Sequence, residues 1–228
     1  MQDTEMHLEV IEWSNKDNNA FYEAVKADGL KGFAQVGGLK TYDMDILKPY
    51  WSQAQAILEV GAGYGRVIDY LLQHQFKGTI TAVEQCNALF EYLEEKFGSY
   101  RNVNLIHENI LKLDSGGHFD LILLLWGFIS DFSPREHLSL FEQSFRLLRR
   151  KGKLVVDTIP VNVKPLFGKK CGKRGNLYSI DVDKASINGY LPEKLEIESY
   201  AQEAGFSNMV DLSFKTDVDR VRLLYIFD

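Results

Sequence analysis

Alternating glycines directly follow an acidic residue on an apolar segment, and this combination can bind a ligand. In residues 57–65 (ILEVGAGYG), Glu59 stands two positions before Gly61, which Gly63 and Gly65 follow at alternate positions. Glycine adopts positive φ and leaves no Cβ in the way of a ligand, while the start of the following helix offers free N–H groups. The sequence therefore predicts a strand–turn–helix corner that holds a nucleotide-like ligand.

The charge at this corner indicates what kind of ligand it accepts. The glycines follow the pattern G-x-G-x-G and not the G-x-G-x-x-G of dinucleotide sites. A diphosphate would meet the carboxylate of Glu59 and be repelled, whereas an amino group would be attracted. We therefore expect a cofactor that carries an amino group and no phosphate.

The motif Glu59-x-Gly61-x-Gly63-x-Gly65 resembles the first motif of the class I S-adenosylmethionine-dependent methyltransferases. That resemblance implies a Rossmann-like domain with S-adenosylmethionine as methyl donor and S-adenosylhomocysteine as product. It implies that the corner contacts the cofactor through Glu59, Gly61, Ala62, Gly63 and Gly65.

A second acidic residue follows the next predicted strand. Residues 79–83 (TITAV) end at Glu84, about twenty residues beyond the glycines, where Rossmann-like folds place the acid that binds a ribose diol. A carboxylate suits a diol because its two oxygens can accept both O–H protons. The alternative is that Glu84 caps the helix starting near Asn87, but the spacing favours the ribose. We count the neighbouring Gln85 among the cofactor residues.

The resemblance also assigns residues after later strands and before the sheet. A third strand, residues 103–107, leads to Asn109, where the family has an adenine-contacting acid or amide, and the backbone of Ile110 can serve the adenine ring. The family more often has Asp at this position, and an Asn in an ordinary turn remains the alternative. We further expect cofactor contacts from Leu125, Trp126 and Tyr42.

Length and composition restrict the class of protein. The chain has 228 residues, of which 45% are hydrophobic and 25% charged, which fits one globular unit with a substantial core. A net charge of −6 argues against broad binding to nucleic acid. No signal peptide or membrane span is predicted, so we expect a cytoplasmic protein without membrane contact. Cys86 and Cys171 are far apart, and we expect neither a metal site nor a disulfide framework.

Strands and helices alternate along most of the chain. We expect a helix near residues 19–27 followed by a glycine-rich loop, and then strands at residues 56–60, 79–83, 103–107, 119–126 and 154–159, the last after a short turn at 149–153. Helices are predicted at residues 66–75, 88–97 and 134–148, the last opened by a capping box of Ser133 and Glu136. Such alternation is typical of a parallel, doubly wound sheet.

The C-terminal end adds a second strong signal. A helix at residues 192–204 precedes strands at 209–214 and 220–227, and the short connection between these strands requires antiparallel pairing. We therefore predict an α/β fold with a doubly wound, mainly parallel seven-stranded sheet and an antiparallel C-terminal hairpin, the class I methyltransferase topology. Residues 1–55 are assigned to an N-terminal helical cap on the substrate side and residues 56–228 to the cofactor-binding domain. Residues 160–191 form an insertion that is a candidate lid.

The loop after the fourth strand is expected to face the methyl acceptor. Residues 126–132 (WGFISDF) lack both the D/N/S-P-P-Y/F signature of nucleobase and amide methylation and the Pro-Cys of cytosine C5 chemistry. Asp131 is the candidate base or substrate-orienting group; the alternative is that it favours the positive end of the next helix. His107 and His137 are interpreted as structural. Aromatic candidates for contact with the acceptor are Phe33, Phe128, Phe132 and Tyr178.

These observations predict an enzyme that transfers a methyl group from S-adenosylmethionine to a small-molecule acceptor, at oxygen or nitrogen ahead of carbon. Two alternatives remain: a non-catalytic module that binds this cofactor, and an NAD(P)-dependent oxidoreductase, which Glu59 and the C-terminal hairpin oppose. The basic residues Lys164, Lys169, Lys170, Lys173 and Arg174 suggest an anionic acceptor or a solvated loop. The sequence fixes neither the acceptor nor the oligomeric state.

Overall fold

The structure is a computed structural model and describes residues 18–114, 118–163, 168–171, 176–182 and 185–228. Its centre is a seven-stranded sheet with the order β3-β2-β1-β4-β5-β10-β9. β1 lies in the middle and pairs in parallel with β2 and β4, while β10 runs antiparallel to both β5 and β9. The predicted mainly parallel sheet with an antiparallel hairpin is confirmed. The strands are β1 Ala56–Val60, β2 Thr79–Glu84, β3 Val103–His107, β4 Phe119–Leu124, β5 Leu148–Thr158, β9 Met209–Lys215 and β10 Val221–Phe227.

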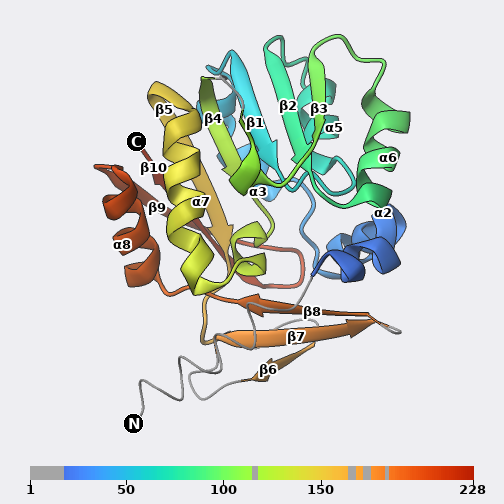
Figure 1. The fold of residues 1–228 in the computed structure, drawn as a ribbon, viewed down its shortest axis with the longest axis vertical. Coiled ribbons are helices and arrows are strands. Elements are labelled where there is room, and N and C mark those ends of the chain that lie inside the picture. Colours follow the sequence, from blue (N-terminus) through green and yellow to red (C-terminus); the bar gives the residue numbers. More distant parts are fainter. Residues whose placement is uncertain (1–17, 115–117, 164–167, 172–175, 183–184) are drawn as a thin grey trace.

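Helices cover both faces of this sheet (Figure 1). Alternate residues of β1 point to opposite faces, so Ile57 packs with one core cluster and Leu58 with the other. On the Ile57 side lie α3 Tyr42–Ile46, α4 Lys48–Trp51, α5 Arg66–Gln73 and α6 Asn87–Phe97. On the Leu58 side lie α7 Pro134–Leu147 and α8 Lys194–Ala204, with the predicted capping box of Ser133 and Glu136 opening α7.

The first helix is longer than the sequence predicted. α2 spans Asn19–Val36 and continues through a kink at Lys26, whose φ is 56° and ψ −176°. The predicted end of the helix near residue 27 agrees with this break, but the predicted glycine-rich loop after it is wrong, because a second helical segment continues to Val36. Val25 and Leu30 are buried against α6 and the small sheet described below, so packing keeps the segment helical despite its glycines. None of the described helices is long and apolar enough to cross a bilayer.

Two strands differ from their predicted bounds. β4 ends at Leu124, before Trp126, whose φ of 55° takes the chain out of the sheet. β5 starts at Leu148, so the predicted turn at residues 149–153 belongs to the strand. A bulge explains this length, because β4 pairs Phe119 with Leu148 but Leu121 with Lys153.

A second, three-stranded antiparallel sheet lies beyond the carboxyl ends of the parallel strands (Figure 1). It consists of β6 Lys169–Cys171, β7 Leu177–Val182 and β8 Ala185–Tyr190, all within the insertion predicted at residues 160–191. The Asn18 side chain donates to the Asn188 carbonyl at 2.8 Å and accepts from the Asn188 amide at 3.1 Å, joining α2 to β8. The side chains that suggested a basic segment, from Lys164, Lys169, Lys170, Lys173 and Arg174, lie outside what the structure describes.

A buried ion pair joins the C-terminal hairpin to the rest of the sheet. Asp157 on β5 is fully buried, and Arg222 on β10 donates to both of its oxygens, from Nε at 3.0 Å and from Nη2 at 2.6 Å. The backbone N–H of Trp126 donates to the same carboxylate at 2.7 Å. This pair therefore holds both the hairpin and the residue that leaves β4 with positive φ.

We expect the substitution Arg222→Met to lower the free energy of unfolding by about 3–5 kcal/mol, because it leaves Asp157 buried without its partner. Urea unfolding measures this change. The matched control is Lys153→Met, which breaks an exposed pair with Asp228 on the same sheet and should cost less than about 1 kcal/mol. Equal stability of the two variants would contradict the role given to the buried pair.

Candidate active site

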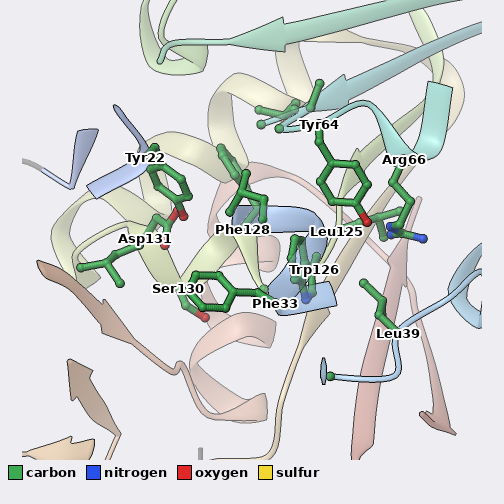
Figure 2. A pocket seen from close by; sticks show the side chains of 18 of the residues that line it. Tyr22, Phe33, Leu39, Tyr64, Arg66, Leu125, Trp126, Phe128, Ser130 and Asp131 are labelled. Atoms are coloured by element: carbon green, nitrogen blue, oxygen red, sulfur yellow. The ribbon is translucent and has the colours of Figure 1, made fainter. Parts of the chain in front are cut away.

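A pocket of about 290 Å³ opens at the carboxyl ends of the parallel strands. Its walls come from the glycine turn after β1, the end of β2, the segment after β4, α2 and the small sheet (Figure 2). Most of the residues predicted for the site share this one cavity. The predicted residues that line it are Phe33, Glu59, Gly61, Ala62, Gly63, Glu84, Gln85, Ile110, Leu125, Trp126, Phe128, Asp131, Phe132 and Tyr178.

The glycine turn has the backbone that its sequence demands. Gly61, Gly63 and Gly65 have φ of 67°, 58° and 77°, which side-chain-bearing residues rarely adopt. A Cβ on Gly61 would lie 2.3 Å from the ring of Phe128, so the wall of the pocket also requires glycine here. Gly65 serves packing instead, because a Cβ there would lie 2.2 Å from the Phe97 ring of α6. Gly65 is thus not among the residues that line the pocket.

Glu59 is a buried carboxyl group with an unused oxygen. Its exposed fraction is 5%, and Oε2 has no hydrogen-bond partner among the described residues. Burial raises the pKa of Glu59 to about 8, against the opposing effect of the Arg66 guanidinium. Arg66 is itself engaged, because it donates to both oxygens of buried Asp43, at 2.8 and 2.5 Å. A cation placed next to Glu59 would favour its charged form, so an ammonium group fits this position.

Glu84 joins the glycine turn to the end of β2. Its Oε2 accepts from the Gly63 amide and its Oε1 from the Cys86 amide, both at 2.9 Å. Burial raises the pKa of Glu84, while these backbone donors act in the opposite direction. Cys86 is the N-cap residue of α6, so the carboxylate braces the helix start and also lines the pocket. The two interpretations of Glu84 are therefore compatible.

Besides Gly65, two predicted cofactor residues are not brought into the pocket. The Asn109 side chain accepts from the Leu111 amide at 2.8 Å and donates to Gln85 Oε1 at 2.9 Å, so it caps a short 3₁₀ turn, Ile110–Lys112. Tyr42 donates its hydroxyl proton to Asp217 on the surface. Neither residue lines the cavity, because local partners hold both side chains elsewhere.

Asp131 lies at the other end of the pocket, in the 3₁₀ turn η2 Phe128–Asp131. The Tyr22 hydroxyl of α2 donates to Asp131 Oδ2, and Asn18 Nδ2 donates to the Asp131 carbonyl at 3.3 Å. Burial raises the pKa of Asp131 to about 7; the Tyr22 hydrogen bond opposes this and the charge of Glu84 adds to it. The start of α7 is already capped by Ser133 and Glu136, so Asp131 is not needed there. A carboxyl group with this pKa can accept a proton near neutral pH.

The two histidines considered from sequence hold the backbone around the pocket. His137 is fully buried, and its Nε2 lies 2.9 Å from the carbonyl oxygen of Ile129, which it supports within η2. Burial lowers the pKa of His137 to about 4, so it stays neutral. His107 stacks on Phe90 with ring centroids 4.6 Å apart. Within the described residues, no three His, Cys, Asp or Glu side chains are grouped to hold a metal ion.

Several residues of the pocket were not predicted from the sequence. Tyr22 is 109 positions from its partner Asp131, and no local pattern marks either residue as half of a pair. Ser130, Tyr64 and Arg66 also line the cavity. Tyr64 lies within the glycine turn, so its place in the sequence alone was enough reason to predict it as a residue of the pocket.

The chain is similar to methyltransferases in sequence. The family described as "Methyltransferase domain" matches residues 57–152. Demethylmenaquinone methyltransferase of Staphylococcus epidermidis is 24% identical over 165 residues, which cover 65% of this chain and 66% of that protein, slightly under two thirds. Ribosomal RNA small subunit methyltransferase A of Dehalococcoides mccartyi is 41% identical over 66 residues, 29% of this chain and 21% of that protein.

Solved structures show the same fold. The Burkholderia thailandensis 1,6-didemethyltoxoflavin-N1-methyltransferase, crystallised with 1,6-didemethyltoxoflavin and S-adenosylhomocysteine, superposes with a TM-score of 0.67. The match covers 98% of this chain and 88% of that one at 16% sequence identity, so it supports the fold. The antiparallel C-terminal hairpin is therefore part of a known methyltransferase architecture.

The raised pKa of Glu59 makes a prediction about stability. A carboxyl whose pKa rises from 4.5 to about 8 on folding stabilises the fold below pH 4.5, and this contribution is lost as pH rises to 8. Without ligand, Glu59→Gln should gain stability relative to the natural protein between pH 5 and 8.5, by roughly 2–4 kcal/mol.

Unfolding experiments at pH 5, 7 and 8.5 measure this difference. Glu95→Gln, at an exposed position of α6, is the matched control for the loss of a carboxylate. A stability difference between Glu59→Gln and the natural protein that stays constant with pH would contradict the burial argument.

Proposed function

We propose that the chain is a class I S-adenosylmethionine-dependent methyltransferase that transfers a methyl group to an oxygen or nitrogen atom of a small molecule. The cofactor of this family supplies a methyl group already activated on a positively charged sulfur. The protein has then to bind both reactants, align them, exclude water and accept a proton where the acceptor loses one. The observation that carries this proposal is that the glycine turn with Glu59 and the carboxyl group of Asp131 line one cavity.

The cofactor side of the pocket suits S-adenosylmethionine. Glu59 offers an unpartnered oxygen to the α-amino group, and the open glycine turn lets the ligand approach the backbone. Glu84 uses one lone pair of each oxygen for a backbone N–H and keeps others for the ribose hydroxyls. We assign the adenine end to Gln85 and Ile110, and the wall next to the methyl group to Leu125 and Trp126.

Three observations favour a small-molecule acceptor over nucleic acid. The net charge is −6, which opposes binding of a polyanion. α2 and the small sheet add walls to the pocket, which narrows the space for an acceptor. The relatives that match over most of their length are named for demethylmenaquinone and 1,6-didemethyltoxoflavin, whereas the ribosomal RNA enzyme matches over 21% of its length.

Asp131 is proposed as the group that orients the acceptor and takes its proton. It lies across the pocket from the cofactor corner, and its pKa of about 7 lets it act as a base at neutral pH. Residues 18–55 contribute to the acceptor side through α2, in keeping with their assignment as a cap.

We expect Glu84→Ala to weaken binding of S-adenosylhomocysteine by at least about tenfold, because it removes the ribose acceptor and releases Gly63 from its hydrogen bond. Isothermal titration calorimetry measures this affinity, and a thermal melt reports the accompanying loss of stability. Glu91→Ala, on an exposed face of α6, is the control. An unchanged affinity with lowered stability would leave Glu84 with a structural role alone.

For an acceptor that the natural protein methylates, Asp131→Asn should lower kcat by about 100-fold while the affinity for S-adenosylhomocysteine changes less than about twofold. A library screen for S-adenosylhomocysteine release identifies such an acceptor, and steady-state kinetics give kcat. Asp211→Asn, which alters an exposed aspartate on β9, is the control. A normal kcat in Asp131→Asn would remove Asp131 as the base.

A further inference from the structure

One side of the pocket lies away from Tyr64 and Arg66. Figure 2 shows Tyr22, Asp131, Ser130 and Phe33 gathered on one side, with Tyr64, Arg66 and Leu39 on the other and Phe128 between them. We call the first side the acceptor compartment. Its residues come from α2, η2 and the small sheet: Phe21, Tyr22, Phe33, Ser130, Asp131, Tyr178, Ile180 and Ile187.

Most of this compartment is a wall of rings. Phe21 and Phe33 stack with centroids 6.2 Å apart and an interplanar angle of 9°. Phe128 and Phe132 meet edge to face at 5.1 Å across the adjoining wall. The ring of Tyr178 covers Gly189, where a Cβ would lie 2.2 Å from it, so this ring is packed in place. Fixed aromatic walls bind flat, apolar rings by stacking and edge contacts.

The carboxyl groups of the acceptor compartment disfavour an anionic acceptor. Asp131 lies in the compartment, and Glu84 is close enough to raise its pKa. Of the three arginines that line the pocket, which are Arg66, Arg220 and Arg222, two are already held in bidentate pairs by the buried aspartates Asp43 and Asp157. An anion placed next to Asp131 would therefore be repelled by that carboxyl group.

One polar group remains to recognise a ligand in the compartment. Tyr22 occupies Asp131 Oδ2, which leaves Oδ1 as an acceptor of a hydrogen bond. The buried Ser130 hydroxyl lies next to Tyr178, whose pKa it lowers through a side-chain hydrogen bond. The compartment therefore fits an otherwise apolar molecule that donates one proton to Asp131.

We propose that the acceptor is an uncharged aromatic or heteroaromatic ring that presents a weakly acidic O–H or ring N–H to Asp131, which Tyr22 holds in position. This inference rests on the proposed function. The acceptor's oxygen or nitrogen forms a bond to the methyl carbon, the carbon–sulfur bond breaks, and its electron pair stays on sulfur. The proton of the acceptor passes to Asp131.

An amine fits the compartment less well than a neutral ring. Burial raises the pKa of Asp131 to about 7, the charge of Glu84 adds to this, and the Tyr22 hydrogen bond opposes it. The carboxyl group is therefore uncharged for part of the time near pH 7, which weakens an ion pair with an ammonium group. A protonated amine also lacks the lone pair that attacks the methyl carbon. A neutral ring O–H or N–H is free of both difficulties.

Binding of four probes of similar size to the protein saturated with S-adenosylhomocysteine tests the acceptor class. The probes are 2-naphthol, saturated 2-decalol, 2-naphthoate and 2-naphthylmethylamine, and calorimetry gives each affinity. We expect 2-naphthol to bind at least about tenfold more tightly than each of the others, and Asp131→Asn to weaken 2-naphthol alone. Equal binding of 2-decalol, preference for the anion or the amine, or no binding of 2-naphthol would overturn the inference. Failure of S-adenosylhomocysteine to bind would instead reject the proposed function.

The pH dependence of 2-naphthol binding tests the role of Tyr22. Since the Tyr22 hydrogen bond lowers the pKa of Asp131, Tyr22→Phe should move the pH at which 2-naphthol affinity changes to a higher value, by about one pH unit. Tyr190→Phe is the matched control, because it removes a buried hydroxyl bound to Glu196 outside the pocket and should leave the profile unchanged. Identical profiles for the natural protein and Tyr22→Phe would remove Tyr22 as a positioning residue.

Discussion

The rest of the pocket is arranged around a carboxyl group that folding has buried with one of its oxygens unused. Glu59 stands on β1, which is fixed between β2 and β4, so it cannot move to reach water. Its side chain lies on the α5 face, where Arg66 is the nearest counterion but is already paired with Asp43. This oxygen is buried without a partner among the described residues, and Glu59 lines the cavity next to a turn whose positive φ values favour glycine. A ligand with a positive group completes this arrangement, which is why the corner fits a cofactor with an α-amino group.

The acceptor side depends on polar contacts that hold η2 in place from several directions. His137 supports the Ile129 carbonyl from α7, and Asp157 holds the Trp126 amide from β5. Tyr22 binds Asp131 from α2, and Asn18 links α2 to the small sheet at Asn188. Apart from the contact of His137 with Ile129, each joins segments that are distant in sequence. They fix the position of Asp131 relative to the glycine turn. Methyl transfer requires this because the protein has to align the acceptor with the methyl group.

Features with a cause in neighbouring residues could be predicted from the sequence. Features that depend on contacts between distant segments could not. Continuous apolar strands, the glycine turn and the capping box of Ser133 have local causes, so β1, β3 and the start of α7 were placed correctly. The helical segment after Lys26 was missed because its glycines are weak helix formers, and packing on α6 overrides them. Asn109 does not line the cavity because its side chain satisfies its own turn. The pair of Tyr22 and Asp131 arises only once the chain has folded.

The central claim is that the buried carboxyl of Glu59 receives the amino group of the cofactor, and calorimetry can test it directly. S-adenosylhomocysteine is titrated into the protein at pH 7 in two buffers of different ionisation enthalpy, which gives the number of protons released on binding. With a pKa of about 8 in the free protein, Glu59 should release close to one proton when the ammonium group arrives, and Glu59→Gln should not. Absence of binding, or binding with the same proton release in both proteins, would contradict the account.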